Sequence, residues 1–294
     1  MINTSEKKNV TLVLSGGGAR GFAHIGAIEE IESRGYIINS IAGTSMGALI
    51  GGVYATGKLN EFKKWAYNLD KQEIFKLIDF SFSNQGLIKG DRVLKTMKKF
   101  IPDANIEDLK IKYTATAFDL AQNKEIVFRV GSLYDAIRAS ISIPTVFTPV
   151  IIGNSVLVDG GVVNNIPIKN AIRTKNDVLI AVYVNAGVPV HHISISKMRK
   201  KQDLHIQKIN EFRKSLFKFN PTDQKKKFHY FNLINNTIAV MTNQIATTIL
   251  RDTPPDILVE ISKKSCETFD FYRAEEMVET GRYAARQTLE SLDD

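Results

Sequence analysis

The chain has few of the features that mark secreted or membrane-spanning proteins. Its 294 residues include one cysteine, Cys266, so no intrachain disulfide can form, as is usual in a reducing compartment. No apolar run approaches the roughly 18 to 20 residues of a membrane span. Residues 1–9 are polar and charged and lack the apolar core of a secretion signal. We therefore expect a cytoplasmic protein whose contact with membranes, where it occurs, is peripheral.

The overall composition is that of a globular protein. A hydrophobic fraction of 44% and a charged fraction of 24% are compatible with a sizeable buried core. No repeat of fixed period and no low-complexity linker interrupts the chain. The sequence therefore favours one domain over residues 1–294 that carries a basic insertion at 191–230.

The net charge of +8 is concentrated in that insertion. Eleven Lys or Arg and three acidic residues lie between positions 191 and 230, so this stretch accounts for the whole excess. Cations interleaved with aromatic side chains suit the headgroup region of an anionic membrane, and we predict a lid or membrane-contact element here. A solvated loop and a homodimer contact are the alternatives. We expect no nucleic acid, because no recognised nucleic-acid-binding fold accompanies the pattern. The aromatic residues are Phe212, Phe217, Phe219, Phe228, Tyr230 and Phe231.

Hydrophobic periodicity predicts alternating strands and helices at the start of the chain. Residues 10–14 and 37–42 resemble buried strands, and residues 22–34 and 46–54 resemble helices. This order implies parallel strands joined by helical crossovers. The pattern is mostly helical over 60–101, with a loop near 81–90, and irregular over 185–230. Further strands are predicted at 111–118, 125–130, 156–158, 178–184 and 257–261, and further helices at 133–140, 231–251 and 274–289.

A glycine-rich loop connects the first predicted strand to the first helix. Read loosely, it matches the GxGxxG dinucleotide fingerprint, which also needs a carboxylate at the end of the second strand. That strand ends Ile41-Ala42-Gly43, so we expect no nucleotide cofactor. Successive glycines can instead converge several backbone N–H groups on a developing oxyanion, next to the positive end of the following helix. A tight structural turn is the alternative. The residues are Gly16, Gly17, Gly18, Ala19, Arg20 and Gly21.

A second motif, Gly43-Thr44-Ser45-Met46-Gly47, is a GxSxG match between a predicted strand and a small-residue helix. In such a turn the serine is held in a strained position, and flanking glycines leave room for an ester to approach. This context predicts that Ser45 is a nucleophile. A serine that only caps the helix is the alternative.

A nucleophilic serine needs a base, and Asp159 is the preferred candidate. It follows a short apolar strand and precedes Gly160 and Gly161, which places a carboxylate at a strand end where α/β sheets gather their sites. Partial burial would raise its basicity. A structural turn cap is the alternative. Of the five histidines, His24 is expected to pack and to form a local hydrogen bond.

The combination of these motifs resembles the patatin-like phospholipase family. The resemblance extends over nearly the whole chain, through the glycine loop, the serine motif, Asp159-Gly160-Gly161 and three further segments: 138–144, 162–167 and the end of the chain from Asp256 to the 281–285 region. It implies a three-layer α/β/α fold with a mainly parallel central sheet, a Ser45–Asp159 dyad, an oxyanion-binding glycine loop, and no metal or nucleotide.

The resemblance also implies the reaction, which is hydrolysis of fatty-acyl ester bonds in phospholipids, lysophospholipids or acylglycerols. Two other functions stay open at this point. One is a thioesterase or short-chain esterase on the same fold, and the other is a non-catalytic, membrane-associated scaffold. The intact Ser45, Asp159 and glycine loop argue against the scaffold.

Overall fold

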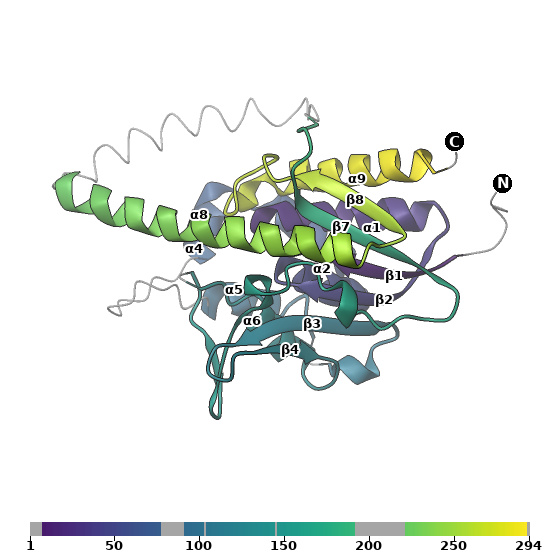
Figure 1. Ribbon diagram of the computed structural model, residues 1–294, viewed down its shortest axis with the longest axis horizontal. Helices are drawn as coiled ribbons and strands as arrows, with labels where there is room; N and C mark the ends of the chain where they lie inside the picture. Colours follow the sequence, from purple (N-terminus) through teal and green to yellow (C-terminus); the bar gives the residue numbers. More distant parts are fainter. Residues whose placement is uncertain (1–7, 78–90, 103, 145, 192–220, 293–294) are drawn as a thin grey trace. The chain divides into compact units, whose positions relative to one another are not determined.

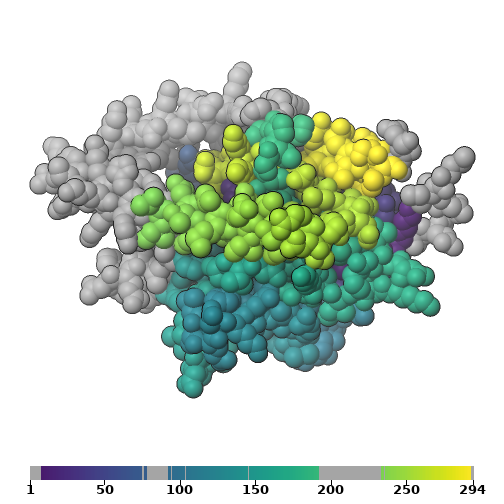
Figure 2. Space-filling view, in the orientation of Figure 1, coloured from purple at the N-terminus to yellow at the C-terminus, as the bar shows by residue number. Residues whose placement is uncertain are grey.

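The computed structural model describes residues 8–77, 91–102, 104–144, 146–191 and 221–292 (Figures 1 and 2). The chain divides into two compact units, one within Met1–His191 and Thr242–Asp294 and the other within His192–Met241. Most of the predicted basic insertion lies outside the described residues. No described helix is long and apolar enough to cross a membrane.

One sheet organises the first unit. In the described residues its strands have the order β5-β6-β3-β2-β1-β7-β8, and β4 also pairs with β3. The run from β3 to β8 is parallel throughout, whereas β4, β5 and β6 join by antiparallel pairing. This confirms the mainly parallel sheet. The strands are β1 (Asn9–Leu14), β2 (Ile37–Thr44), β3 (Lys112–Asp119), β4 (Lys124–Phe128), β5 (Val150–Ile152), β6 (Ser155–Asp159), β7 (Asp177–Ala186) and β8 (Ile257–Ser262).

Helices connect and cover these strands (Figure 1). The α-helices are α1 (Ala23–Ser33), α2 (Met46–Ala55), α3 (Leu59–Tyr67), α4 (Lys71–Leu77), α5 (Asp91–Met97), α6 (Leu133–Ser140), α8 (Pro221–Asp252) and α9 (Ala274–Glu290). Short 3₁₀ turns are η1 (Gly18–Phe22), η2 (Ile106–Asp108), η3 (Gly160–Val162), η4 (Ile168–Asn170) and η5 (Phe271–Arg273).

Both faces of the sheet are buried, which gives the fold its three layers. Along β1, Leu12 and Leu14 belong to the larger core beneath α1, α2 and α9, whereas Val13 belongs to a smaller core on the opposite face. The last turns of α8 cover that second face through Ala246 and Ile249. Figure 1 shows this yellow-green end of α8 in front of the sheet. Alternate residues of a strand point to opposite faces, so a doubly covered strand is apolar throughout.

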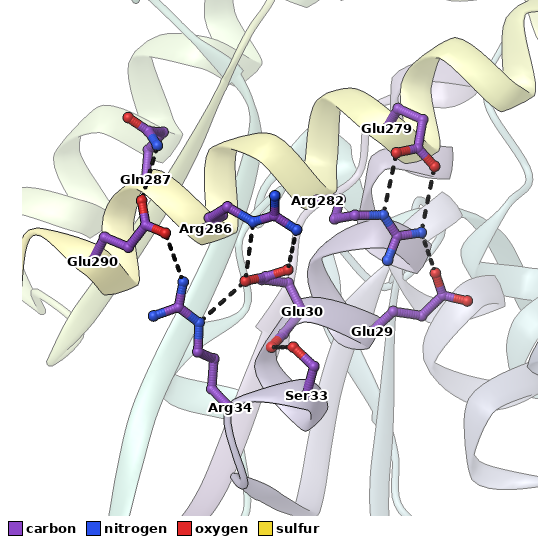
Figure 3. A network of polar contacts seen from close by, with 9 residues as sticks. All are labelled: Glu29, Glu30, Ser33, Arg34, Glu279, Arg282, Arg286, Gln287 and Glu290. Atoms are coloured by element: carbon purple, nitrogen blue, oxygen red, sulfur yellow. Dashed lines mark hydrogen bonds and ion pairs between the residues drawn. The ribbon is translucent and has the colours of Figure 1, made fainter.

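Helices α1 and α9 approach each other at backbone distance. A Cβ added at Gly26 would lie 1.8 Å from the Val278 carbonyl oxygen, and one at Gly281 would lie 1.9 Å from that of Ala23. Charged side chains link the same two helices along their exposed edge (Figure 3). Because α1 directly follows the glycine loop, this packing holds the loop in place. The linked residues are Glu29, Glu30 and Arg34 on the α1 side and Arg282, Arg286 and Glu290 on α9.

The predicted elements up to residue 60 are confirmed to within two residues at almost every end, and α6 is confirmed at both ends. Two predictions were wrong. The helix predicted to start at 231 starts at Pro221, because a lysine-rich segment has no apolar stripe to reveal it, although proline is favoured in a first helical turn. The strand β5 was not predicted, because it has only three residues and Ile151 and Ile152 are exposed.

Candidate active site

Ser45 lies in a strained turn between β2 and α2. Its backbone angles are φ 56° and ψ −123°, a left-handed conformation that is rare for a residue with a side chain. The glycines on either side permit this turn. A Cβ at Gly43 would lie 2.5 Å from the Ala48 nitrogen, and one at Gly47 would lie 2.2 Å from the Leu14 carbonyl oxygen. The predicted strand–elbow–helix arrangement around Ser45 is therefore present.

Asp159 is the last residue of β6 and contacts Ser45. Ser45 directly follows β2, and both β2 and β6 pair with β3: Thr44 pairs with Thr116, and Asp159 pairs with Ala117. This register brings the two strand ends together although 114 positions separate Ser45 from Asp159 in the sequence. The Ser45 side chain is hydrogen bonded to the Asp159 carboxyl group.

The environment of Asp159 makes it a stronger base than an exposed aspartate. Burial raises the pKa of its carboxyl group to about 6, against the opposing effect of hydrogen bonds from the Ser45 side chain and the Gly161 N–H. The Gly161 nitrogen lies 2.7 Å from Oδ1, so one carboxyl oxygen has a fixed donor. A carboxylate with this pKa is ionised at neutral pH and can accept a proton from a hydroxyl group.

The Asp159 turn has glycines where other residues would not fit. A Cβ at Gly160 would lie 2.4 Å from the Thr116 carbonyl oxygen. A Cβ at Gly161 would lie 2.9 Å from Asp159 Oδ1 and 3.1 Å from Asn165 Oδ1. The Gly-Gly pair therefore keeps the carboxyl group close to both β3 and the following loop.

The glycine loop lies against the serine. A Cβ at Gly16 would be 3.1 Å from the Ser45 Cβ, and one at Gly21 would be 2.2 Å from the Met46 Cγ. The Gly16 N–H donates to the Asn165 carbonyl at 3.0 Å, and the Ala19 N–H donates to the Thr268 carbonyl at 2.9 Å. These two groups are therefore occupied in holding the loop, which narrows the predicted set of oxyanion donors.

Two N–H groups of the loop remain for a ligand. Within the described ranges, no acceptor is found for the N–H of Gly17 or of Gly18. Gly18 has φ +57°, and a Cβ there would lie 2.4 Å from the Thr268 carbonyl oxygen, so glycine is required. Neighbouring N–H groups without acceptors are able to stabilise a developing oxyanion.

Arg20, the charged residue of the loop, forms structural hydrogen bonds. Its Nε donates to Asn185 Oδ1 at 3.0 Å and its Nη1 donates to the Cys266 carbonyl at 2.9 Å. Burial lowers the pKa of the guanidinium, which nevertheless stays cationic because arginine is protonated at any physiological pH. Arg20 thus ties the loop to the end of β7 and to the segment after β8.

His24 is excluded as the base by its surroundings. It is buried in α1, its Nε2 lies 2.8 Å from the Ser15 carbonyl oxygen, and burial lowers its pKa to about 4. The ring is therefore neutral at neutral pH and donates one hydrogen bond to the strand end. The predicted local role is confirmed. His191 contacts Tyr283, His192 and His205 lie outside the described residues, and nothing is described of the His229 side chain.

The end of α6 supplies contacts that sequence reasoning missed. Ser140 Oγ accepts the Ser45 N–H at 2.9 Å and donates to the Thr116 carbonyl at 2.6 Å. The Ser142 carbonyl accepts the Asp159 N–H at 2.9 Å. One short segment therefore fixes the backbone of both the serine and the aspartate. Both serines lie in the segment 138–144, which contributes to the family resemblance, but the sequence alone does not indicate which groups they contact.

The segment after the Asp159 turn links the other two parts of the site. The Thr44 hydroxyl donates to the Asn164 carbonyl at 2.9 Å. The Asn165 carbonyl accepts the Gly16 N–H, and Asn165 Nδ2 donates in return to the Gly16 carbonyl at 3.3 Å. The serine turn, the aspartate turn and the glycine loop are thus mutually hydrogen bonded. No group of three or more His, Cys, Asp or Glu among the described residues is placed to hold a metal ion.

Comparison with known proteins gives the class of protein that carries this arrangement. The chain belongs to the patatin-like phospholipase family, whose sequence pattern matches residues 12–172, a range that contains the glycine loop, Ser45 and Asp159. The family match, together with relatives named as lysophospholipases, supports a lipid acyl hydrolase.

Relatives of similar length are uncharacterized NTE family proteins from Mycobacterium bovis and Mycobacterium tuberculosis. Each is 31% identical to this chain, in an alignment that covers 99% of this chain and 94% of the relative. Lysophospholipase NTE1 of Candida glabrata is 26% identical over 96% of this chain, which corresponds to 16% of that longer protein. The solved structure of VipD from Legionella pneumophila aligns with a TM-score of 0.44 at 11% identity, over 97% of this chain and 67% of that one.

Proposed function

We propose that this chain is a serine hydrolase that cleaves fatty-acyl esters through Ser45 and Asp159. The observation that carries the proposal is the hydrogen bond between the Ser45 side chain and a buried carboxyl group with a pKa of about 6. The N–H groups of Gly17 and Gly18, which have no acceptor among the described residues, support it further. A buried carboxyl group that only capped a turn would not need a strained serine beside it.

The geometry supports a two-step reaction. Asp159 accepts the hydroxyl proton as Ser45 Oγ attacks the ester carbonyl, and the carbonyl oxygen becomes an oxyanion held by the Gly17 and Gly18 N–H groups. The ester C–O bond breaks, and the proton on Asp159 passes to the departing alcohol. Water then gives a proton to Asp159 and attacks the acyl group on Ser45. The C–O bond to Ser45 breaks, the proton returns to Ser45 Oγ, and a fatty acid leaves.

For the substrate, we propose a lipid with one or two long acyl chains, in the first place a lysophospholipid. Support comes from the family and from the relatives named lysophospholipases. The +8 charge of residues 191–230 also suits a substrate presented at an anionic lipid surface. Removal of residues 197–227 should therefore weaken sedimentation with phosphatidylserine vesicles and leave binding to phosphatidylcholine vesicles unchanged. Unchanged sedimentation with the anionic vesicles would remove the membrane part of the proposal.

The proposal is tested by fatty-acid release from lysophosphatidylcholine, with butyryl-thiocholine and p-nitrophenyl butyrate as short-chain comparisons. Wild-type protein and a Ser291→Ala control, which alters an exposed serine at the end of α9, should release fatty acid. Ser45→Ala and Asp159→Asn should each lose at least about 10³-fold in kcat. Full activity in either variant would overturn the dyad. Faster turnover of the short thioester than of the lipid would show that the site acts on a different substrate class.

A further inference from the structure

The peptide group between Gly16 and Gly17 is held from one side by two asparagines. The Gly16 carbonyl oxygen accepts Nδ2 of Asn185 at 2.7 Å and Nδ2 of Asn165 at 3.3 Å. Asn185 is the next-to-last residue of β7, and a Cβ added at Gly17 would lie 3.4 Å from its Oδ1. The carbonyl therefore has both of its acceptor positions filled by fixed donors.

The direction of this carbonyl determines the direction of the Gly17 N–H. In a trans peptide the C=O and N–H bonds lie in one plane and point in opposite directions, and the described residues contain no cis peptide bond. The Gly17 N–H thus points away from Asn185, and it has no acceptor in the described part of the protein. Since Gly16 itself lies against Ser45, this N–H belongs to the same small region as the nucleophile.

The hydrogen bond from Arg20 identifies which atom of the Asn185 amide is the oxygen. Its Nε can only donate, so the atom it meets at 3.0 Å must be the amide oxygen, and Nδ2 is left for the Gly16 carbonyl. The series of hydrogen bonds runs from the half-buried Arg20 cation through the Asn185 amide to the Gly16 carbonyl. In a low-dielectric interior such a chain polarises each member, including the N–H at the far end of the last peptide.

We propose that Asn185 is a positioning residue of the oxyanion hole, which turns and polarises the Gly16–Gly17 peptide so that the Gly17 N–H meets the developing oxyanion. Arg20 fixes Asn185 in the orientation that this requires. The inference rests on the proposed function. It assigns a transition-state role to a residue of β7 that lies 140 positions from Ser45 in the sequence.

The direct test is Asn185→Asp, measured with p-nitrophenyl butyrate and lysophosphatidylcholine. Aspartate keeps the shape and gives Arg20 an ion-pair partner, but it places an acceptor where the Gly16 carbonyl needs a donor. We expect kcat to fall by about 10- to 100-fold, less than the loss of a whole oxyanion donor, with KM within about 2-fold of wild type. Asn68→Asp, the same change on an exposed residue after α3, is the control and should leave kcat unchanged.

The pH profile separates this role from a merely structural one. A disturbed dyad would move the midpoint of kcat/KM, whereas loss of oxyanion stabilisation lowers the plateau and leaves the midpoint near the Asp159 pKa of about 6. Wild-type kcat in a folded Asn185→Asp protein, or a shifted midpoint, would overturn the proposal. An inactive wild-type protein would overturn the proposed function as well, so the two failures are distinguishable.

A second variant keeps the test decisive if Asn185→Asp folds poorly. Arg20→Lys retains a cation but loses the planar Nε donor to Asn185. Because Arg20 acts through Asn185, its effect on kcat should be smaller, about 3- to 10-fold, and the double variant should be no slower than Asn185→Asp alone. Unchanged kcat in Arg20→Lys, or effects that multiply in the double variant, would contradict the relay.

Discussion

Replacing Asp159, the proposed catalytic base, with asparagine should abolish activity and stabilise the protein. Asp159 is 5% exposed, and in the folded protein its ionised form has lost most of its hydration. The amide introduced by Asp159→Asn is neutral at every pH. Its oxygen can still accept the Gly161 N–H, and its nitrogen can donate to Ser45 Oγ. The variant therefore removes the buried charge and keeps the hydrogen bonds.

The size of the effect follows from the pKa of the carboxyl group. Folding raises it from 3.8, the value of an exposed aspartate, to about 6, a difference that corresponds to about 3 kcal/mol. A raised pKa means that the folded state binds the proton more tightly than the unfolded state. The stability that comes from this proton is complete below pH ~4 and is lost as pH rises through about 6. The free energy of unfolding of Asp159→Asn should thus equal that of wild type at pH ~4 and exceed it by about 3 kcal/mol at pH ~8.

Urea unfolding of both proteins between pH 4 and pH 8 measures this difference. Asp135→Asn, at an exposed position in the first turn of α6, is the control and should change the free energy of unfolding by less than about 0.5 kcal/mol at all pH values. The difference in unfolding free energy between Asp159→Asn and wild type should be larger at pH 8 than at pH 4. An inactive variant for which this difference is the same at both pH values would refute the burial of a charged Asp159.

Three further outcomes are expected. The kcat/KM of wild type should rise with pH through about 6 and then level off, because only ionised Asp159 accepts a proton. Stopped-flow ester hydrolysis between pH ~4.5 and ~8.5 measures this profile, and a midpoint below about 5 would contradict it. Ser140→Ala should lower kcat about 10-fold, because the Ser45 N–H loses its acceptor, and cost about 1–3 kcal/mol of unfolding free energy; unchanged kinetics would count against that contact. Gly26→Ala should destabilise the protein by at least about 1–3 kcal/mol, since its Cβ would meet the Val278 carbonyl; an unchanged melting temperature would show that α1 and α9 are not so closely packed.

Local sequence signals were enough to predict the parts of the site. The turn at Ser45 is encoded by Gly43 and Gly47, which lie within two residues of it, and the loop by consecutive glycines. The glycine loop and Ser45 follow the parallel strands β1 and β2, whose carboxyl ends lie at one edge of the sheet. Asp159 instead ends β6, which runs antiparallel to β3. For these reasons the α/β class and the elbow were accessible without a structure, whereas the approach of Asp159 to Ser45 depends on the antiparallel pairing of β6 with β3.

The contacts that hold these parts together could not be predicted in the same way. Ser140 and Ser45 are 95 positions apart, and Asn185 and Gly16 are 169 positions apart. Whether they meet depends on strand order and on the exact register of β3 and β7, which hydrophobic periodicity does not specify. Strand β5 was missed for a related reason, because a short exposed strand has no buried face to give an alternating pattern.

The most direct test of the central claim is mass spectrometry of the protein after treatment with a fluorophosphonate probe, with and without lysophosphatidylcholine vesicles. An activated serine attacks phosphorus, expels fluoride and keeps the phosphonyl group, whereas ordinary serines do not react. We expect one modified tryptic peptide, with the label on Ser45, and its loss in Ser45→Ala. Folded wild-type protein that stays unlabelled under both conditions, or that is labelled at another residue, would contradict a Ser45–Asp159 hydrolase.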